Sequence, residues 1–200
     1  ANVNRRARDA SGRVRLGSNP AGPVDRRIGL IRLDKAGGGP LALIANYAMH
    51  ATVLGGGSTL VSGDGPGVVA EYVEKKLGAP MPYLNGAAGN IAPIHSTRAE
   101  AEADLLSRFE VLLGDPILDA NRRLAATTAE VKLRTSRIIL ETPKRPDLKW
   151  PDELKDYLRV TNDGKETLLV PLRFLRINDD IVIWSAPMAL FCEVSGDCLL

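Results

Sequence analysis

Residues 41–47 (LALIANY) form a nearly continuous apolar run, which is the pattern of a strand buried on both faces of a sheet. Residues 28–34 (IGLIRLD) predict a strand before it, and the glycine-rich residues 35–40 fit a hairpin loop that makes the two strands antiparallel. Helical periodicity follows at residues 66–77 and again over residues 96–127, where Pro116 predicts an interruption. Further strands are expected at residues 82–85, 130–141, 168–177 and 180–185. This order predicts an α/β fold, a mixed β-sheet with helices packed on it.

Composition excludes several classes of protein. The chain has 200 residues, of which 44% are hydrophobic and 25% charged, so it can bury a globular core. No apolar run approaches the roughly 20 residues that span a bilayer. A net charge of +2 and an aromatic content of 4% argue against nucleic-acid binding. Cys192 and Cys198 lie too late and too close together to form a disulfide framework.

Residues 1–27 differ from the rest of the chain. They carry seven arginines against Asp9 and Asp25, with Asn, Gly and Pro between them and little periodicity. We interpret them as a basic loop segment ahead of an α/β core at residues 28–200. Such a segment either binds phosphate or carboxylate groups or is a solvated surface. The chain begins at Ala1 and ends soon after a strand pattern, so we expect it to form part of a larger domain.

His50 directly follows the buried strand and opens a glycine-rich loop. A histidine at the end of a central strand suits a metal ligand or an acid–base group. The alternative is a histidine whose ring nitrogens are satisfied by backbone carbonyls, and its position alone does not decide between them.

Two further segments combine small residues with polar ones. Asp64 precedes a helix, where it acts either as a simple cap or as part of an anion site at the helix N-terminus. Residues 85–93 (NGAAGNIAP) let the backbone approach a ligand or a neighbouring strand closely, yet contain no Ser, Thr or Cys nucleophile. His95 and Ser96 follow, and we interpret them as residues of a helix start.

Five motifs in this order resemble the neutral/alkaline, non-lysosomal ceramidases and their bacterial relatives. They are residues 4–6 (NRR), 19–25 (NPAGPVD), 46–54 (NYAMHATVL), 62–67 (SGDGPG) and 84–93 (LNGAAGNIAP). The resemblance covers residues 2–95 well and the remainder loosely. It implies that residues 1–200 are part of one catalytic domain of a zinc-dependent hydrolase.

Members of that family cleave the N-acyl bond of ceramide, a linear amide, with zinc polarising the carbonyl and activating water. The resemblance assigns His50 as a zinc ligand and Arg5 as an active-site cation that stabilises charge on the carbonyl oxygen or product carboxylate. It also implies a small lipid or N-acyl amide substrate and a place in bacterial sphingolipid metabolism. For the full-length protein it allows peripheral membrane contact and a secreted or periplasmic location.

The sequence departs from the family pattern at several ligand positions. The resemblance places one zinc histidine before Ala1 and a ligand tyrosine beyond Leu200. Ala92 stands where the ceramidases have a serine, and Ala189 where they have a carboxylate ligand, with Glu193 as an imperfect substitute. Because catalytic zinc sites use about three protein ligands, we expect this chain alone to hold an incomplete site.

Three hypotheses follow from these patterns. The first is part of a ceramidase-like zinc hydrolase that is inactive as this chain alone. The second is a degenerate relative that keeps the fold as a ligand-binding module, which Ala92 and Ala189 favour. The third is an unrelated α/β domain that binds phosphate through Arg5, Arg6 and the helix terminus at Asp64.

Overall fold

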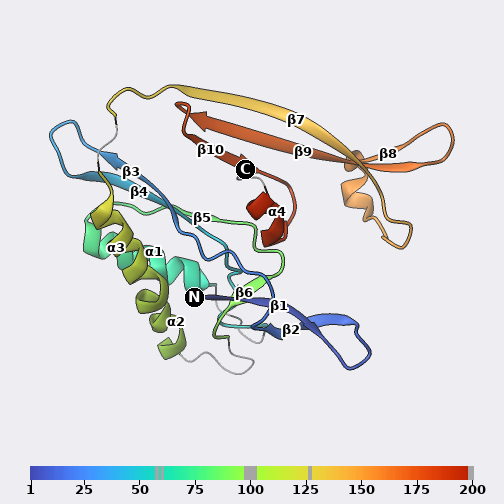
Figure 1. The fold of residues 1–200 in the computed structure, drawn as a ribbon, viewed down its shortest axis with the longest axis horizontal. Helices are drawn as coiled ribbons and strands as arrows, with labels where there is room; N and C mark the ends of the chain where they lie inside the picture. The colour runs from blue at the N-terminus through green and yellow to red at the C-terminus, as the bar shows by residue number, and fades with distance from the viewer. Residues whose placement is uncertain (57–58, 60, 97–102, 126–127, 198–200) are drawn as a thin grey trace. The chain divides into compact units, whose positions relative to one another are not determined.

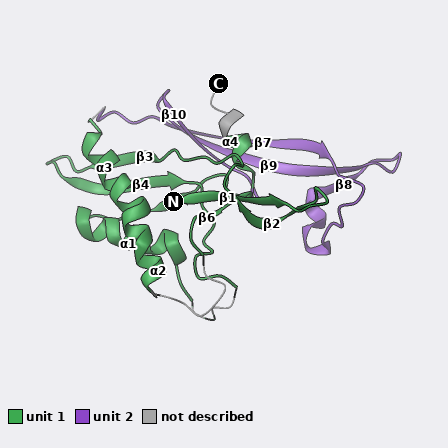
Figure 2. Cartoon of the chain, turned by 60° about the horizontal axis from the view of Figure 1, so that its bottom comes forward, with its two compact units in different colours: residues 1–125, 190–200 green, residues 126–189 purple. Residues whose placement is uncertain are grey.

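The computed structural model describes residues 1–56, 59, 61–96, 103–125 and 128–197 (Figure 1). Among these residues, no helix has the length and apolar character that crossing a membrane requires. The chain divides into two compact units, residues 1–125 with 190–200 and residues 126–189 (Figure 2). That all 200 residues belong to one catalytic domain stays a prediction.

Unit 1 contains a three-stranded sheet in the order β3-β4-β5, formed by Gly29–Asp34, Pro40–Tyr47 and Tyr83–Asn85. The apolar strand β4 is central; it is antiparallel to β3, as the hairpin pattern predicts, and parallel to β5. The helices α1 (Asp64–Leu77) and α2 (Ala103–Phe109) belong to the same unit. Their apolar side chains join those of β4 in one core that includes Leu43, Tyr47, Val73 and Phe109. The mixed α/β fold class is therefore confirmed.

The arginine-rich head is a loop only in part: residues 20–27 form no helix or strand, but most of residues 1–19 form two strands, which corrects the expectation there. Strands β1 (Asn2–Arg8) and β2 (Val14–Asn19) pair antiparallel, and β1 also pairs with β6 (Ile91–Pro93) in a second sheet. The buried side chains of β1 are polar: Asn2 donates to the carbonyls of Asp25 and Ala48, and Asn4 to that of Pro23. Because these asparagines replace the usual apolar residues, the strand lacks a hydrophobic periodicity.

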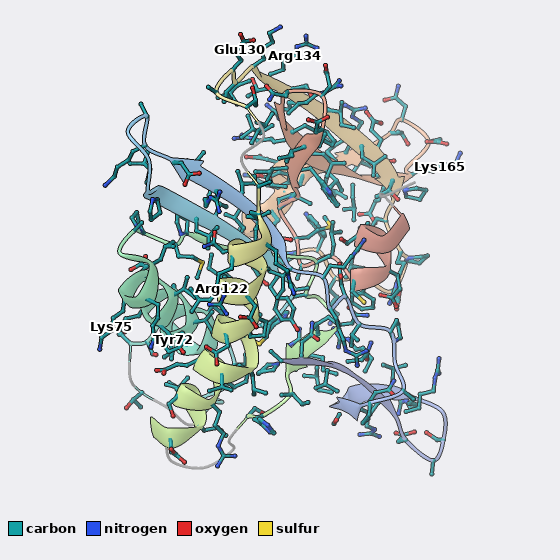
Figure 3. All side chains as sticks on the ribbon, turned by 60° about the vertical axis from the view of Figure 1, so that its left-hand side comes forward. Tyr72, Lys75, Arg122, Glu130, Arg134 and Lys165 are labelled. Atoms are coloured by element: carbon teal, nitrogen blue, oxygen red, sulfur yellow. The ribbon has the colours of Figure 1, made fainter. Side chains whose placement is uncertain are left out.

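The chain stays helical past Pro116, but the regular α-helix is interrupted just before it. From α2 the path passes through one π-helical turn, η1 (Glu110–Gly114), into α3 (Asp115–Arg123), with Pro116 in the first turn of α3. Tyr72 of α1, labelled in Figure 3, donates to the Asp115 carboxylate at 2.7 Å. Residues 97–102, 126–127 and Cys198 lie outside the described residues.

Unit 2 is built on one antiparallel sheet in the order β10-β9-β7. It contains β7 (Leu133–Pro143), β9 (Glu166–Ile177) and β10 (Ile181–Ser185), and β8 (Leu158–Val160) pairs with β9. A short 3₁₀ helix, η2 (Asp152–Tyr157), precedes β8. The β9–β10 turn holds three residues rather than two, since Ile177 pairs with Ile181. The last helix, α4 (Cys192–Asp197), returns the chain to unit 1.

Candidate active site

His50 lies three residues beyond the end of β4, and its ring is held on one side by the backbone of β6. Its Nδ1 atom is 3.0 Å from the carbonyl oxygen of Ile91. A carbonyl oxygen only accepts, so Nδ1 carries the proton and donates it. The other nitrogen, Nε2, is therefore left with its lone pair. This contact is the one that a backbone-satisfied histidine makes, and it also orients the ring as in a ligand histidine.

Arg5 of β1 faces that lone pair. Its Nη2 atom lies 3.0 Å from Nε2 of His50, and because guanidinium only donates, the imidazole accepts. Nη2 and Nε of Arg5 also donate to the carbonyl of Gly89, at 3.0 and 3.2 Å. The structure thus brings together the two residues that the sequence analysis assigned to the site, although 45 positions separate them.

The surroundings favour the neutral form of His50. Burial lowers the pKa of its imidazole below the ordinary value of 6.5, and the charges of Arg5 and Arg6 lower that pKa further. The hydrogen bond from Nδ1 to the Ile91 carbonyl opposes the shift without reversing it. At neutral pH the pair is therefore a fixed cation beside an uncharged base.

Arg6 is a residue of this site that the sequence reasoning did not place here. Its Nη2 donates to the same Gly89 carbonyl at 3.1 Å, and its guanidinium lies 5.2 Å from the ring centroid of Phe191. Its only sequence signal was its place beside Arg5 in the motif NRR at residues 4–6. Two guanidinium groups converging on one carbonyl oxygen give this corner of unit 1 a concentrated positive charge.

The small-residue loop before β6 allows the close approach that its sequence predicts. A Cβ atom on Gly86 would lie 3.1–3.2 Å from atoms of Ala48, just before His50. Asn90, which is 1% exposed, fixes the far side of the loop: it donates to Glu193 at 2.8 Å and accepts from the backbone N–H of Cys192 at 2.9 Å. The loop therefore ties the β4 end to helix α4.

Asp64 acts as neither a simple cap nor an anion site. Gly63 stands at the cap position, and the buried Asp64 carboxylate accepts from the backbone N–H groups of Val53, Leu54 and Gly65 at 2.7–3.0 Å. Its φ is +54°, a left-handed conformation that few non-glycine residues adopt. Because the Asp64 carboxylate already occupies the start of α1, that helix terminus cannot bind the phosphate group that the third hypothesis requires. Asp64 instead anchors the loop that follows His50.

The remaining candidates lie around the pair rather than in it. Ala92 is half-buried on β6 and pairs with Val3 of β1. Glu193 accepts from Asn90 and from the buried Cys192 thiol at 3.3 Å, and within the described part of the chain it makes no hydrogen bond to His50. Burial raises the pKa of that thiol. His95 is half-buried, two residues after β6.

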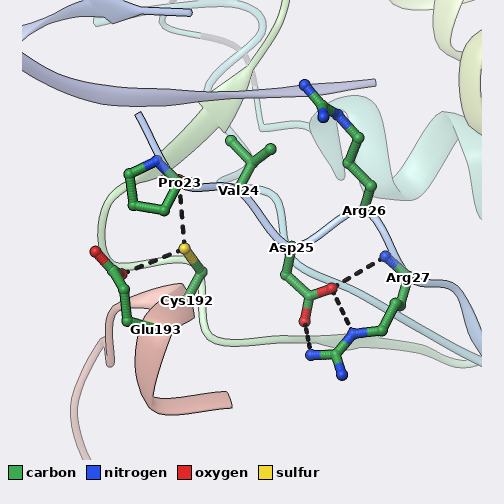
Figure 4. A pocket seen from close by; sticks show the side chains of 7 residues that line it. All are labelled: Pro23, Val24, Asp25, Arg26, Arg27, Cys192 and Glu193. Atoms are coloured by element: carbon green, nitrogen blue, oxygen red, sulfur yellow. Dashed lines mark hydrogen bonds and ion pairs between the residues drawn. The ribbon is translucent and has the colours of Figure 1, made fainter. Parts of the chain in front are cut away.

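A hollow of about 500 Å³ opens beside α4 in unit 1 (Figure 4). In it Arg27 holds the Asp25 carboxylate with two hydrogen bonds, at 2.9 and 2.7 Å. The hollow has seven lining residues: Pro23, Val24, Asp25, Arg26, Arg27, Cys192 and Glu193. Arg5 and His50 do not line it, so the pair does not form this hollow.

The side chains around His50 determine whether a zinc ion fits here. His50 has the tautomer and backbone support of a ligand histidine, but Arg5 covers the lone pair that would bind the metal. Across the described residues, no group of three or more His, Cys, Asp and Glu side chains could hold a metal ion. A zinc site needs about three protein ligands, so the residues present do not by themselves fit the ion.

Chemically, the pair can do two things. The Arg5 guanidinium can donate to an oxygen on which negative charge develops, and the neutral His50 Nε2 can accept a proton or bind an electrophile if Arg5 moves to that oxygen. Both are needed when the carbonyl of an amide or ester is attacked.

Comparison with known proteins bears on the fold. No family model matches the sequence, and no curated protein matches it. The structure is similar to the neutral ceramidase from Pseudomonas aeruginosa, with a TM-score of 0.54 and 14% identity over 77% of this chain and 33% of that one. A second structure, a ceramidase complexed with C2, gives a TM-score of 0.49 and 17% identity over 74% of this chain and 22% of the other. The chain therefore has the fold of part of a neutral ceramidase and spans about a third of that protein's length.

Proposed function

We propose that this chain forms part of a ceramidase-like hydrolase that cleaves an N-acyl amide bond of a lipid such as ceramide. The observation that carries the proposal is the contact between Arg5 Nη2 and His50 Nε2, made within a fold similar to that of a neutral ceramidase. The two residues that the family resemblance assigned from separate motifs meet at 3.0 Å.

Arg5 has the role of stabilising charge. In amide hydrolysis the carbonyl oxygen becomes negative in the tetrahedral intermediate, and a preorganised guanidinium stabilises that charge. The two hydrogen bonds to Gly89 hold the Arg5 side chain in place before substrate binds. After cleavage, the same cation faces the product carboxylate.

His50 has the role of a single ligand in a zinc site that other residues of the whole protein would complete. Zinc, when bound, would polarise the amide carbonyl and lower the pKa of a bound water. What His50 itself supplies is an imidazole whose tautomer is fixed by Ile91, so that Nε2 has no proton to lose and can bind once the Arg5 guanidinium turns from it to the substrate oxygen.

Hydrolysis of a fluorogenic N-acyl lipid by the full-length protein with zinc tests this function. Removing one charge-stabilising donor costs about 10²–10³ in kcat, so Arg5→Ala should lose that much activity. Arg8→Ala is the matched control, because Arg8 lies on the same strand and its side chain is exposed. No turnover by the zinc-saturated wild type would contradict the proposal, as would an Arg5→Ala enzyme as active as the control.

A ligand-binding module without catalysis is the second candidate, favoured by Ala92 and by the cover that Arg5 gives the His50 lone pair. Calorimetric zinc titration of this 200-residue chain addresses it. Because one imidazole is a weak site, we expect affinity no tighter than micromolar. A tight single site abolished by His50→Ala would contradict that expectation. Binding of the N-acyl lipid by the full-length protein without any hydrolysis would support the module.

A further inference from the structure

Two arginines lie directly opposite each other on the sheet of unit 2, remote in sequence from the His50 site. In the register of the sheet Arg137 of β7 pairs with Arg173 of β9, and Arg173 pairs with Ser185 of β10. All three residues are exposed. Directly opposite residues of an antiparallel sheet point to the same face with Cβ atoms about 4.5–5.5 Å apart, so the three side chains leave the sheet in one row on the same face.

Neither arginine of this row has an internal counter-charge. Within the described residues, Arg137 and Arg173 make no side-chain hydrogen bond or ion pair. Like charges placed directly opposite destabilise a sheet. The row is therefore a position where a bound anion would relieve repulsion rather than displace an existing partner.

A second arginine pair on the other face of the same sheet shows the contrast. Arg134 pairs with Arg176, but Arg176 donates to the Asp179 carboxylate at 2.7 Å and to the carbonyl of Asn178 at 3.1 Å. One arginine of that pair is thus neutralised by the turn between β9 and β10. Arg134, labelled in Figure 3, therefore provides a control on the same strand.

Apolar residues border the unneutralised row along the same face. On one side, Leu175 pairs with Ile183 and with Thr135; on the other, Ile139 pairs with Pro171. Ile139 is 51% exposed. A ligand whose charged group sits on the arginines would therefore lay its remaining atoms on apolar surface.

We propose that Arg137, Arg173 and Ser185 bind the oxyanion of an amphiphile, a carboxylate or phosphate group that carries an apolar tail. A guanidinium matches either oxyanion with two parallel hydrogen bonds, and the Ser185 hydroxyl adds a third donor group. The site is independent of the hydrolytic function proposed for Arg5 and His50, and it does not require that function.

Calorimetric titration of the full 200-residue chain with dodecanoate, kept below its micelle concentration, and with inorganic phosphate tests the site. Charge-assisted contacts are strong, so Arg137→Gln and Arg173→Gln should each weaken dodecanoate binding by about tenfold or more, and Arg134→Gln should leave it unchanged. Dodecanoate should bind more tightly than phosphate because of the apolar border. Equal binding of the two anions would overturn the assignment of an apolar tail. No binding of either anion, or equal weakening by Arg134→Gln, would overturn the site itself.

Urea unfolding gives a second readout that does not depend on the choice of amphiphile. Phosphate should raise the unfolding midpoint of the wild type, because an anion that binds only the folded chain stabilises it. Arg173→Gln should unfold at higher urea than the wild type without phosphate and should lose the response to phosphate. A variant that keeps the full response would contradict the proposal.

Discussion

At the scale of single residues, His50 couples the site to pH. Its folded pKa lies below the ordinary value of 6.5, so below that pH the unfolded chain takes up a proton that the folded chain does not. Stability rises with pH wherever the unfolded state binds more protons, so this contribution is present above about pH 6.5 and is lost as the pH falls toward the lowered folded pKa. His50→Asn, which keeps a donor for the Ile91 carbonyl but does not titrate, should flatten the dependence of the unfolding free energy on pH between neutral and mildly acidic conditions. His95→Asn is the control, and an unchanged slope in His50→Asn would contradict the account.

Asp64 is the second residue whose replacement is informative. Asn tolerates the left-handed backbone, so Asp64→Asn keeps the conformation and replaces one carboxylate oxygen with an NH₂ group that faces a backbone N–H. A buried donor left without its acceptor costs about 1–3 kcal/mol, and urea denaturation should show a loss of that size. Asp104→Asn, on exposed Asp104 of α2, should stay within about 0.5 kcal/mol of the wild type. Equal effects of the two variants would exclude the anchoring role.

At the scale of elements, the packing of η1 against α1 requires that Gly114 has no side chain. A Cβ atom on Gly114 would lie 2.6 Å from Cδ1 of Tyr72, whereas one on Gly67 of α1 would meet nothing within 4 Å. Overpacking costs about 1–3 kcal/mol, so Gly114→Ala should destabilise the chain by that amount in thermal or urea unfolding. Gly67→Ala should instead stabilise it by about 0.5–1 kcal/mol, because alanine favours a helix. A neutral Gly114→Ala would mean that η1 and α1 do not pack as described.

The elements also show which parts of the fold can be predicted from sequence. Strand β4 follows from its apolar run, although the structure buries only one of its faces, the one with Leu43, Ala45 and Tyr47. Strand β1 could not be predicted this way, since Asn2 and Asn4 are buried through hydrogen bonds to carbonyls of distant segments. Near Pro116 the sequence predicts an interruption, and the structure has a π-helical turn just before the proline instead of a break, a form that no sequence pattern indicates.

At the scale of the whole molecule, the candidate site is assembled from segments far apart in the chain. The family motifs identified Arg5 and His50, but their contact depends on the pairing of β1 with β6 and on the position of His50 beyond β4, which only tertiary structure provides. Arg6 and Asn90 were not predicted in the site. Arg6 contacts the backbone carbonyl of Gly89, and Asn90 contacts Glu193 of helix α4, about 100 residues along the chain, and neither partner leaves a sequence signal. The arginine row of unit 2 likewise exists only through strand register.

A double-mutant cycle on kcat/KM of the full-length protein, with an N-acyl lipid as substrate, tests the central claim most directly. Residues that act as one unit show strongly non-additive losses. If Arg5 and His50 form one catalytic pair, Arg5→Ala and His50→Ala should each remove most of the activity, and the double variant should be about as impaired as the worse single variant. Losses that add in free energy, or a His50→Ala protein that keeps wild-type kcat/KM, would contradict a shared role for the two residues.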